Sequence, residues 1–343
     1  MWQAPRMRYI VIGTGAVGGT VGARLAGGGR EVVCVARGAH REALERDGLR
    51  LVTPEGEHAY RLPVVGGPEE LGELRADDVL LLAVKSQDTV AALDAWAPRP
   101  VAGGGTAGER LPVLCLQNGV VNERVALRRF ARVVGVCVWM PSTYLEAGVV
   151  GAGGVPLTGI LHLGSYPPGR PEPVLDAVAA DLRASRFDAP LPEDVMPWKY
   201  AKLLDNLPNA IEALLGPLEG PEALALVAEA RAEGAAVLAA AGIVTVGEEE
   251  ARRVRGERVR LLPVPGVPRG GGSTWQSLRR GASSVEADWL NGEIVLLGRL
   301  HGVPTPVNET LRALVNELAR AGGGPGAYTP AGLRERIEAA ARA

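Results

Sequence analysis

A glycine motif near the N-terminus constrains the fold more than any other feature of the sequence. Gly13-Thr14-Gly15-Ala16-Val17-Gly18 follows an apolar run at 9–12 and opens a helix-like stretch that ends in Gly27-Gly28-Gly29. In a G-x-G-x-x-G turn the first glycine permits tight turning, the second lets the backbone approach a pyrophosphate, and the third allows close helix–strand packing. The chain has 46 glycines, so the strand–turn–helix context carries the prediction. It predicts a dinucleotide-binding unit; the alternative is a glycine turn without a ligand.

The first half of the chain alternates short apolar runs with helix-like stretches. The apolar runs lie at 9–12, 31–36, 79–84, 112–116, 133–138 and 159–163. Runs that are apolar throughout are typical of strands in a parallel sheet covered on both faces. We therefore predict an α/β fold whose N-terminal part is a Rossmann-type, doubly wound parallel sheet.

The second half has a different pattern, with strand-like runs nearly absent. Helices are expected at 196–215, 221–241, 247–262, 285–300 and 306–321, with a Pro/Gly-rich loop at 262–272 and a short helix or frayed tail at 333–343. A length of 343 residues is about twice that of a typical single domain. The prediction is a Rossmann domain at 1–188 and an all-helical C-terminal domain, for substrate and dimerisation, at 189–343.

The composition limits the kinds of partner and cellular location that we expect. The 37 Lys and Arg nearly balance the 39 Asp and Glu, which argues against nucleic acid as the main partner. No apolar run has the length of about 18 residues that a membrane span needs, and residues 1–8 lack the apolar centre of a secretion signal. The three cysteines lie in apolar runs, as buried reduced thiols do. We expect a cytoplasmic protein in which residues 1–6 are a dispensable extension.

The residue after the second strand indicates which dinucleotide binds. NAD enzymes usually place Asp or Glu there to hold the ribose 2′-hydroxyl. Here the strand runs into Arg37, whereas Glu31 stands at its opposite end. A guanidinium suits a 2′-phosphate, so Arg37 predicts NADP(H). The alternative for Arg37 is a solvated cation in a loop.

Two more loops follow apolar runs at the edge of the sheet where ligands of such folds bind. Lys85 lies in the first, and it could serve the cofactor or an acidic group of a substrate, or be a surface lysine. Asn118 lies in the second, in Gln117-Asn118-Gly119, and it could hold the nicotinamide ribose or the substrate. Because Asn-Gly is a turn dipeptide, a plain turn is the alternative for Asn118.

The order of these motifs resembles the ketopantoate reductase family. The N-terminal half has G-T-G-A-V-G, A-V-K-S-Q-D-T and Q-N-G in order. In the second half, W-K-Y-A-K-L-L-D-N at 198–206 is similar to the family's W…K-L-x-x-N, and V-E-A-D-W-L-N-G at 285–292 to its E-x-D-x-L-N-G. The resemblance covers nearly the whole chain. It implies an NADPH-dependent 2-oxoacid reductase with a Rossmann domain and a helical domain through which a homodimer can form.

The resemblance implies two catalytic residues, Lys202 as the general acid and Glu286 as the acidic residue that binds the substrate. A buried lysine has a lowered pKa and can donate a proton or stabilise an oxyanion. One alternative is that Lys202 lies on a solvated helix face, and another is that Lys199, one turn earlier, is the true catalytic group. For Glu286 the alternative is a helix cap, because Ser283-x-x-Glu286 also reads as a capping box.

Further substrate-binding positions follow from the same resemblance: Asn118, Asn206, Asn209, Ser273 and Thr274. Lys85 and Asn118 are also implied in cofactor binding. The chain departs from the family in three places. Position 210 is Ala where a second Asn is expected, so Asn209 stands one residue early. Thr274 falls where the family has a substrate-binding serine, with Ser273 adjacent. Residues 139–142 read Trp-Met-Pro-Ser where many members have His-Ala.

The expected reaction is reduction of a small 2-oxoacid to a 2-hydroxyacid, with 2-dehydropantoate to pantoate as the first choice. A paralogous reductase of another ketone or imine is the alternative among enzymes, since residues 139–142 face the active site in the family. A non-catalytic sensor that binds NADP is the alternative from another class. Lys202 and Glu286 together favour an enzyme, because a sensor needs neither. No metal site is expected.

Overall fold

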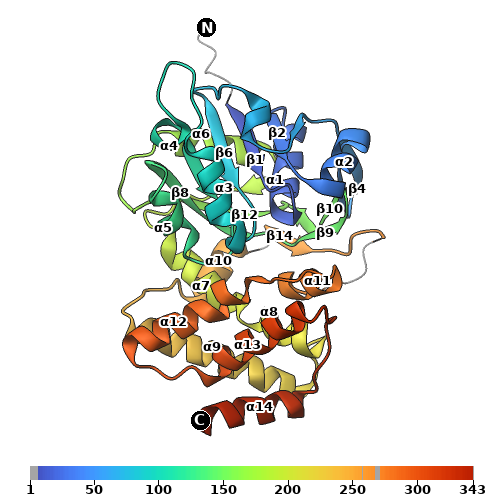
Figure 1. Ribbon diagram of the computed structural model, residues 1–343, viewed down its shortest axis with the longest axis vertical. Coiled ribbons are helices and arrows are strands. Elements are labelled where there is room, and N and C mark those ends of the chain that lie inside the picture. The colour runs from blue at the N-terminus through green and yellow to red at the C-terminus, as the bar shows by residue number, and fades with distance from the viewer. Residues whose placement is uncertain (1–6, 257, 267–270, 343) are drawn as a thin grey trace. The chain divides into compact units, whose positions relative to one another are not determined.

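The computed structural model describes residues 7–256, 258–266 and 271–342, which form two compact units (Figure 1). Among these residues the first unit contains 7–117, 121–196 and 248–266 without 257, and the second contains 118–120, 197–247 and 271–342. The predicted boundary at 188 differs from this division, because residues 189–196 and the 248–266 segment cluster with the first unit. The roles expected for the two domains stay predictions.

The first unit is built on an eight-stranded sheet. Its strand order is β13-β12-β8-β7-β6-β1-β2-β5. The strands are β1 (Arg8–Ile12), β2 (Glu31–Val35), β5 (Val64–Val65), β6 (Asp78–Leu82), β7 (Pro112–Cys115), β8 (Arg132–Trp139), β12 (Gly159–Tyr166) and β13 (Phe187–Asp188). All six predicted apolar runs are strands of this sheet.

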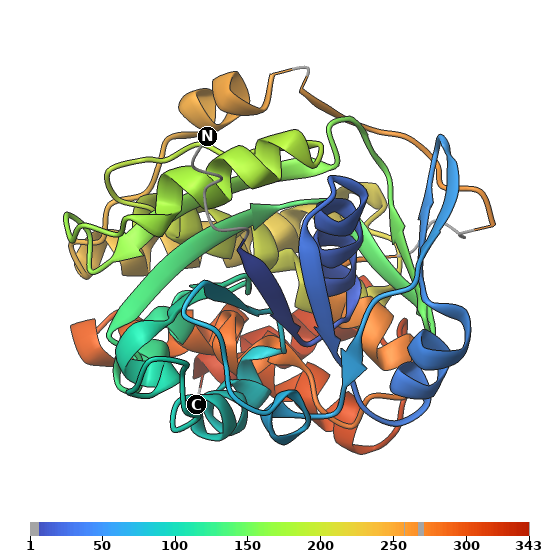
Figure 2. The ribbon, with the colours of Figure 1, turned by 90° about the horizontal axis from the view of Figure 1, so that it is seen from above.

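Helices cover both faces of the sheet, as expected for a doubly wound fold. The helices α1 (Ala16–Gly27) and α6 (Val174–Ala184) pack on one face, against Val11 and Leu81 among others. The helices α3 (Thr89–Trp96), α4 (Ala107–Arg110) and α5 (Asn122–Leu127) pack on the other, against Ile10 and Leu80 (Figure 2). Neighbouring residues of one strand therefore face two different buried layers, which explains why the runs are apolar throughout.

The sheet is parallel as predicted except at one strand. The strand β12 runs antiparallel to β8. The connection between them holds β9 (Ser142–Glu146), β10 (Val149–Ala152) and β11 (Gly154–Pro156) and has no crossover helix, so the chain need not return in the parallel sense. Two of these strands join β3 (Leu49–Thr53) and β4 (Gly56–Tyr60) in a four-stranded sheet, β4-β3-β10-β9, that the sequence analysis missed.

The helix predicted at 247–262 is wrong in its second half. The helix α10 (Glu248–Arg255) is followed by Gly256, whose φ of 44° lies in the left-handed region that commonly terminates helices. The chain then forms β14 (Val259–Leu261), which pairs antiparallel with β11 of the first unit. In the predicted loop, residues 262–266, 271 and 272 are neither helix nor strand. Residues 267–270, like the proposed extension at 1–6, lie outside the described residues.

The second unit is helical, which confirms the predicted class. Its helices are α7 (Met196–Asn206), α8 (Pro208–Leu215), α9 (Gly220–Ala240), α11 (Ser273–Arg279), α12 (Asn291–His301), α13 (Pro306–Arg320), α14 (Pro330–Arg342) and the 3-10 turn η3 (Glu286–Trp289). The predicted helix at 196–215 is interrupted at Leu207, because Pro208 has no N–H to continue the ladder. The core of the second unit includes Ile211, Leu214, Leu226 and Leu311.

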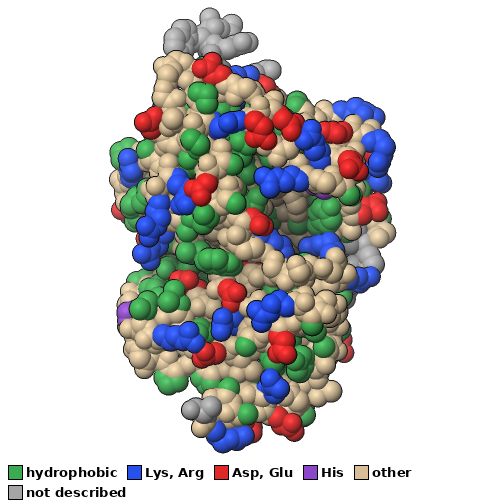
Figure 3. Space-filling model, viewed as in Figure 1, with side chains coloured by type: hydrophobic (Ala, Val, Ile, Leu, Met, Phe, Trp, Pro, Cys, Tyr) green, Lys and Arg blue, Asp and Glu red, His purple; other side chains and the backbone are tan. Residues whose placement is uncertain are grey.

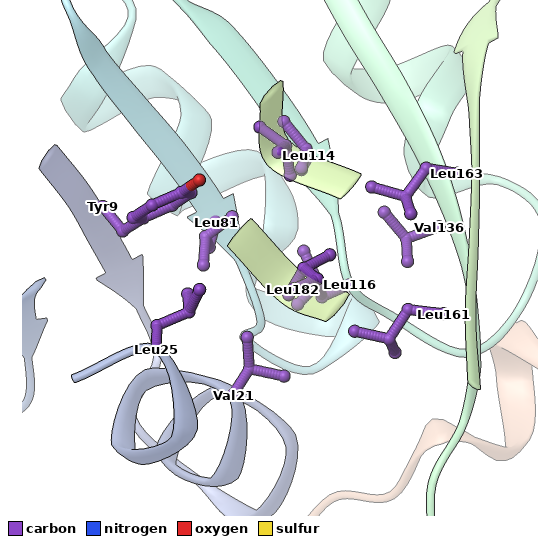
Figure 4. Close-up of a pocket in the computed structure, with 11 residues that line it drawn as sticks. Tyr9, Val21, Leu25, Leu81, Leu114, Leu116, Val136, Leu161, Leu163 and Leu182 are labelled. Atoms are coloured by element: carbon purple, nitrogen blue, oxygen red, sulfur yellow. The ribbon is translucent and has the colours of Figure 1, made fainter. Parts of the chain in front are cut away.

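A small apolar gap lies inside the first unit, between the sheet and the helices α1 and α6 (Figure 4). Its lining consists of aliphatic side chains and the ring of Tyr9, whose hydroxyl donates a hydrogen bond to Asp181 at 2.7 Å. A gap without free polar groups belongs to the core and is no site for the charged ligand that the sequence predicts.

Charged side chains of both signs are interspersed on the face seen in Figure 3. Several of the acidic and basic side chains form ion pairs, such as Arg41 with Glu70 at 2.7 Å and Arg75 with Glu31 at 2.7 Å. Among the described helices, none has both the length and the apolar character that a membrane crossing requires.

Candidate active site

Two glycines of the Gly13–Gly18 loop are required by packing. Gly13 has a φ of 95°, and a Cβ there would lie 2.7 Å from the backbone nitrogen of Val84. A Cβ on Gly18 would lie 2.1 Å from the Gly13 carbonyl oxygen and 2.9 Å from a methyl carbon of Val11. The loop and the start of α1 therefore lie directly on β1 and on the end of β6, as the motif predicts.

Gly15 is different, because the space beside it is open. A Cβ there would have no described atom within 4 Å outside its own chain neighbours. Gly15 is the N-cap of α1, followed by Ala16 and Val17 in the first turn, whose N–H groups have no acceptor within a helix. Thr14 fixes the loop beside it, since its N–H and its hydroxyl both donate to the Val35 carbonyl, at 3.3 and 3.0 Å. Open space at a helix N-terminus fits a pyrophosphate.

Arg37 lies at the carboxyl end of β2, as the N-cap residue of α2 (Gly38–Asp47). Its side chain is exposed, and its Nε donates a long hydrogen bond of 3.4 Å to the Gly66 carbonyl. It forms no ion pair with the described residues, whereas Arg41 on the same helix binds Glu70 bidentately. An exposed guanidinium without a carboxylate partner fits a 2′-phosphate. Glu31 cannot serve the ribose, since it pairs with Arg75 at the other end of the strand.

A buried polar cluster fixes the loop that carries Lys85. The Gln117 amide donates to the Val84 carbonyl at 2.8 Å and to the Thr89 hydroxyl at 2.7 Å. The Thr89 hydroxyl in turn donates to Asn122 at 2.9 Å. Lys85 itself is half-buried and directly precedes the 3-10 turn η2 (Ser86–Asp88). The cluster thus joins the loops after β6 and β7, both at the carboxyl edge of the sheet, where the prediction places the cofactor.

In the second unit, Lys202 and Asn206 lie one turn apart on α7. Lys202 is half-buried. Asn206 is 5% exposed, and its Nδ2 is buried without a hydrogen-bond acceptor among the described residues. Buried amide donors are nearly always paired in native proteins, so an unpaired one next to a lysine indicates a place for a ligand oxygen. Lys199, the alternative catalytic lysine, is buried.

Asn209 lies in α8, beyond the interruption at Leu207. Its Nδ2 is 3.4 Å from the hydroxyl oxygen of Ser273, the first residue of α11, and Thr274 beside it is buried. The neighbouring Ala210 belongs to the apolar core. The structure therefore brings Asn209 and Ser273 together, and position 210 faces away from them. Glu212, which no sequence motif marks, accepts a hydrogen bond from the Gly272 N–H at 2.6 Å and so fixes the start of α11.

Glu286 is the first residue of η3 and is half-buried. The capping-box alternative is wrong, because the turn begins at Glu286 itself and its N-cap, Val285, caps through no side chain. A capping box would need the glutamate three residues inside a helix. The turn that contains Asn118 lies next to η3, since a Cβ on Gly119 would be 3.1 Å from the Trp289 carbonyl.

Asn291, from the same motif as Glu286, has a structural role. It is 1% exposed, and its amide donates to the Leu207 carbonyl at 3.2 Å and to Asn308 at 2.9 Å. Asn308 donates in turn to the Ala230 carbonyl at 3.0 Å and to Glu233 at 2.6 Å. This network ties the interruption between α7 and α8 to three other helices, and so it fixes the part of the chain that follows Asn206.

The two units define a class of protein: a dinucleotide-binding α/β unit in one chain with a helical unit that carries a lysine and a set of amide and hydroxyl groups. No group of three or more His, Cys, Asp or Glu among the described side chains is placed to hold a metal ion. Such a combination is typical of oxidoreductases that rely on a nicotinamide cofactor for the redox step.

Family comparisons identify the relatives. Residues 9–168 match the family "Ketopantoate reductase PanE/ApbA" and residues 194–319 match its C-terminal counterpart. The chain is 31% identical to the 2-dehydropantoate 2-reductase of Mesorhizobium japonicum, over 91% of this chain and 98% of that protein. It is 28% identical to the enzyme of that name from Pyrococcus horikoshii, over 93% and 99%. The chain therefore belongs to the ketopantoate reductase family, as an oxidoreductase whose cofactor is NADP(H).

Solved structures agree with this assignment. The ketopantoate reductase of Ralstonia eutropha JMP134 superposes with a TM-score of 0.74 at 30% identity, over 92% of this chain and 99% of that one. A D-mandelate dehydrogenase, solved with NADH and anilino(oxo)acetate, has a TM-score of 0.76 at 21% identity, over 92% and 99%. The second likeness supports the fold alone.

Proposed function

We propose that this protein reduces 2-dehydropantoate to pantoate with NADPH. The observation that carries the proposal is the pair on α7, where the half-buried Lys202 precedes by one turn a buried Asn206 whose amide nitrogen has no acceptor among the described residues. A 2-oxoacid needs a proton donor for the developing alkoxide and donors for its oxygen atoms. The relatives' name supports the choice of 2-oxoacid.

The residues of the first unit bind the cofactor in this proposal. The Gly13–Gly18 loop and the first turn of α1 hold the pyrophosphate, Arg37 holds the 2′-phosphate, and Lys85 adds a cation at the carboxyl edge of the sheet. Asn118, which clusters with the second unit, holds either the nicotinamide ribose or the substrate. When bound, NADPH supplies the hydride.

The residues of the second unit bind and protonate the substrate. Lys202 donates the proton to the carbonyl oxygen as this oxygen becomes an alkoxide, and Asn206 donates a hydrogen bond to a substrate oxygen. The Asn209–Ser273 pair and Thr274 supply amide and hydroxyl groups for the carboxylate. Glu286 accepts a hydrogen bond from a hydroxyl group of the substrate.

The test is NADPH oxidation with a panel of 2-oxoacids that includes 2-dehydropantoate. We expect turnover with 2-dehydropantoate, and Lys202→Ala should lower kcat by orders of magnitude while the Kd for NADPH stays within about twofold. Asp205→Ala is the matched control, because Asp205 is an exposed neighbour on the same helix. Full activity of Lys202→Ala would remove Lys202 as the acid. NADPH binding without turnover of any oxoacid or imine would support the sensor.

A reductase of another ketone or imine is the second candidate, and one observation favours it. The family resemblance leads us to expect His-Ala at 139–142, where this chain begins with Trp139, and the Arg255 guanidinium lies over the Trp139 ring at 5.2 Å. A bulky ring with a cation beside it suits a larger or more acidic substrate than 2-dehydropantoate. Higher kcat/KM for such a compound across the panel would decide for this candidate.

We also propose that the protein is cytoplasmic and forms a homodimer through its helical unit. Cys34, Cys115 and Cys137 are all buried and none of them forms a disulfide, as suits a reducing compartment. Leu296 and Leu300, one turn apart on α12, are 51% and 68% exposed, which suits a contact surface. Light scattering of the purified protein tests the dimer, and cell fractionation tests the location.

A further inference from the structure

His40 connects three segments that lie far apart in the sequence. It belongs to α2 and is half-buried. Its Nε2 lies 2.7 Å from the Thr14 carbonyl oxygen, in the dinucleotide loop. Its Nδ1 lies 2.9 Å from the Gly148 backbone nitrogen, in the turn between β9 and β10, and 3.2 Å from the Tyr144 hydroxyl. None of these partners is within 25 residues along the chain, so the sequence alone suggested no role for His40.

The partners fix the state of the imidazole. The backbone N–H of Gly148 can only donate a hydrogen bond, so Nδ1 accepts it. The Thr14 carbonyl can only accept, so Nε2 carries the hydrogen and donates. A neutral imidazole protonated on Nε2 satisfies both contacts, while a second proton on Nδ1 would oppose the Gly148 N–H. Burial lowers the pKa of His40, which favours this neutral form.

The contact between His40 and the Thr14 carbonyl determines the orientation of the Thr14–Gly15 peptide group in the loop. In a trans peptide the C=O and the following N–H point in opposite directions. His40 holds the Thr14 carbonyl, so the Gly15 N–H of the same peptide points away from His40. On the other side of Thr14, its N–H and hydroxyl are both held by the Val35 carbonyl. The peptide before Gly15 is therefore fixed in orientation by contacts on both sides.

The turn that holds His40 from its other side also packs on α2. Gly148 has a φ of 81°, and a Cβ there would lie 3.0 Å from the Ala43 side chain. The Tyr144 ring centre lies 5.1 Å from that of His40. The imidazole is thus held in place by the four-stranded sheet and does not depend on the ligand for its orientation.

We propose that His40 is a positioning residue for the cofactor, which aims the Gly15 N–H at the pyrophosphate by holding the Thr14 carbonyl. The proposal rests on NADP(H) binding at the Gly13–Gly18 loop. Preorganised donors bind an anion more tightly because the loop does not have to be ordered during binding. The loss of His40 should therefore weaken cofactor binding and leave the later chemical step unchanged.

Two conservative variants separate the two ends of the ring. In His40→Gln the amide reaches the position of Nε2 and can still donate to Thr14. In His40→Asn it reaches the position of Nδ1 and keeps only the side toward Gly148. NADPH titration by fluorescence should show a Kd about tenfold higher for His40→Asn and His40→Ala, and within about threefold of wild type for His40→Gln. The kcat at saturating NADPH should stay within about twofold in all three.

The control is His58→Ala, since His58 is an exposed histidine of β4 in the same unit. Urea unfolding without cofactor checks that each variant is folded. Equal Kd values for His40→Asn and wild type would overturn the proposal, as would a loss in kcat that matches the rise in KM. If the wild-type protein itself fails to bind NADPH, the assignment of the cofactor fails, and that result is distinguishable because it does not depend on any variant.

Discussion

A pair of glycine substitutions separates cofactor binding from packing within one motif. Gly15→Ala adds a methyl group where no described atom outside the neighbouring residues lies within 4 Å. The backbone of Gly15, with φ of −78° and ψ of −154°, is extended and open to alanine. The unfolded chain loses freedom, so the ligand-free protein should be as stable as wild type or more stable by about 0.5 kcal/mol.

The same methyl group should damage cofactor binding. It occupies the side of the loop that the pyrophosphate approaches, and it displaces at least one hydrogen bond from an N–H group to a charged oxygen. Such a bond contributes about 2 kcal/mol, which corresponds to a Kd for NADPH about 30-fold above the wild-type value.

Gly18→Ala should show the reverse order of effects. Its Cβ would lie 2.1 Å from the Gly13 carbonyl and 2.9 Å from the side chains of Val11 and Ala83, so α1 must move away from the sheet. Overpacking of this kind costs about 1–3 kcal/mol, and we expect the upper end because a carbonyl oxygen cannot rotate away.

Urea unfolding of the ligand-free protein and fluorescence titration with NADPH at one salt concentration measure the two quantities. Gly247→Ala is the matched control, because its Cβ also meets no described atom within 4 Å and it lies outside the motif. Two results would contradict these roles of Gly15 and Gly18: a loss of stability in Gly15→Ala as large as that in Gly18→Ala, or a wild-type Kd for NADPH in Gly15→Ala.

Three further predictions concern single side chains. Arg37→Ala should raise the Kd for NADPH about 30-fold and leave the Kd for NADH within threefold, with Arg41→Ala as control, and equal effects on both would remove the 2′-phosphate role. Burial lowers the pKa of His162 to about 4, so the folded protein favours the neutral imidazole. The free energy of unfolding is therefore unaffected above pH 6.5 and falls by about 3 kcal/mol as the pH drops toward 4. In His162→Phe, the free energy of unfolding should fall less steeply between pH 7 and pH 4 than in wild type. An unchanged pH dependence would contradict the lowered pKa of His162. Asn206→Leu should keep ligand-free stability in urea yet lower kcat/KM, whereas Asn291→Leu should lose about 2 kcal/mol, and the opposite order would contradict both assignments.

The fold of the first unit was predictable where a local sequence pattern reflects burial directly. The strand–turn–helix around Gly13–Gly18 lies within about 25 residues, and the strands of the large sheet are buried on both faces, so their apolar runs stand out. The four-stranded sheet could not be found in this way. The residues 57–59 of β4 are all exposed, and its sequence Gly-Glu-His-Ala-Tyr has no apolar run. Pairing with β3, through the backbone and the Arg50–Glu57 ion pair at 2.6 Å, determines that strand.

Breaks between helices, and contacts between residues far apart in the sequence, were also not predictable from the sequence. The single helix predicted at 196–215 is two helices, and the start of the second at Pro208 also depends on Asn291, whose amide donates to the Leu207 carbonyl 84 residues away in the chain. The strand β14 forms because β11 of the first unit offers it an edge. His40 has the same character, since both ends of its ring meet segments that only the fold brings close.

The hydrogen bonding of three buried asparagines in the helical unit is the strongest structural sign of a binding site there. Asn291 and Asn308 are 1% and 0% exposed, and their amide groups are paired with a backbone carbonyl, with each other and with a carboxylate. Asn206 lies one residue before Leu207, in the same environment, and its amide nitrogen has no acceptor among the described residues. An unpaired buried donor costs about 1–3 kcal/mol, and a leucine would avoid this cost. A fold that pairs the other two amides so completely keeps this one unpaired at a functional position, where a substrate oxygen can complete the hydrogen bond that the ligand-free protein lacks.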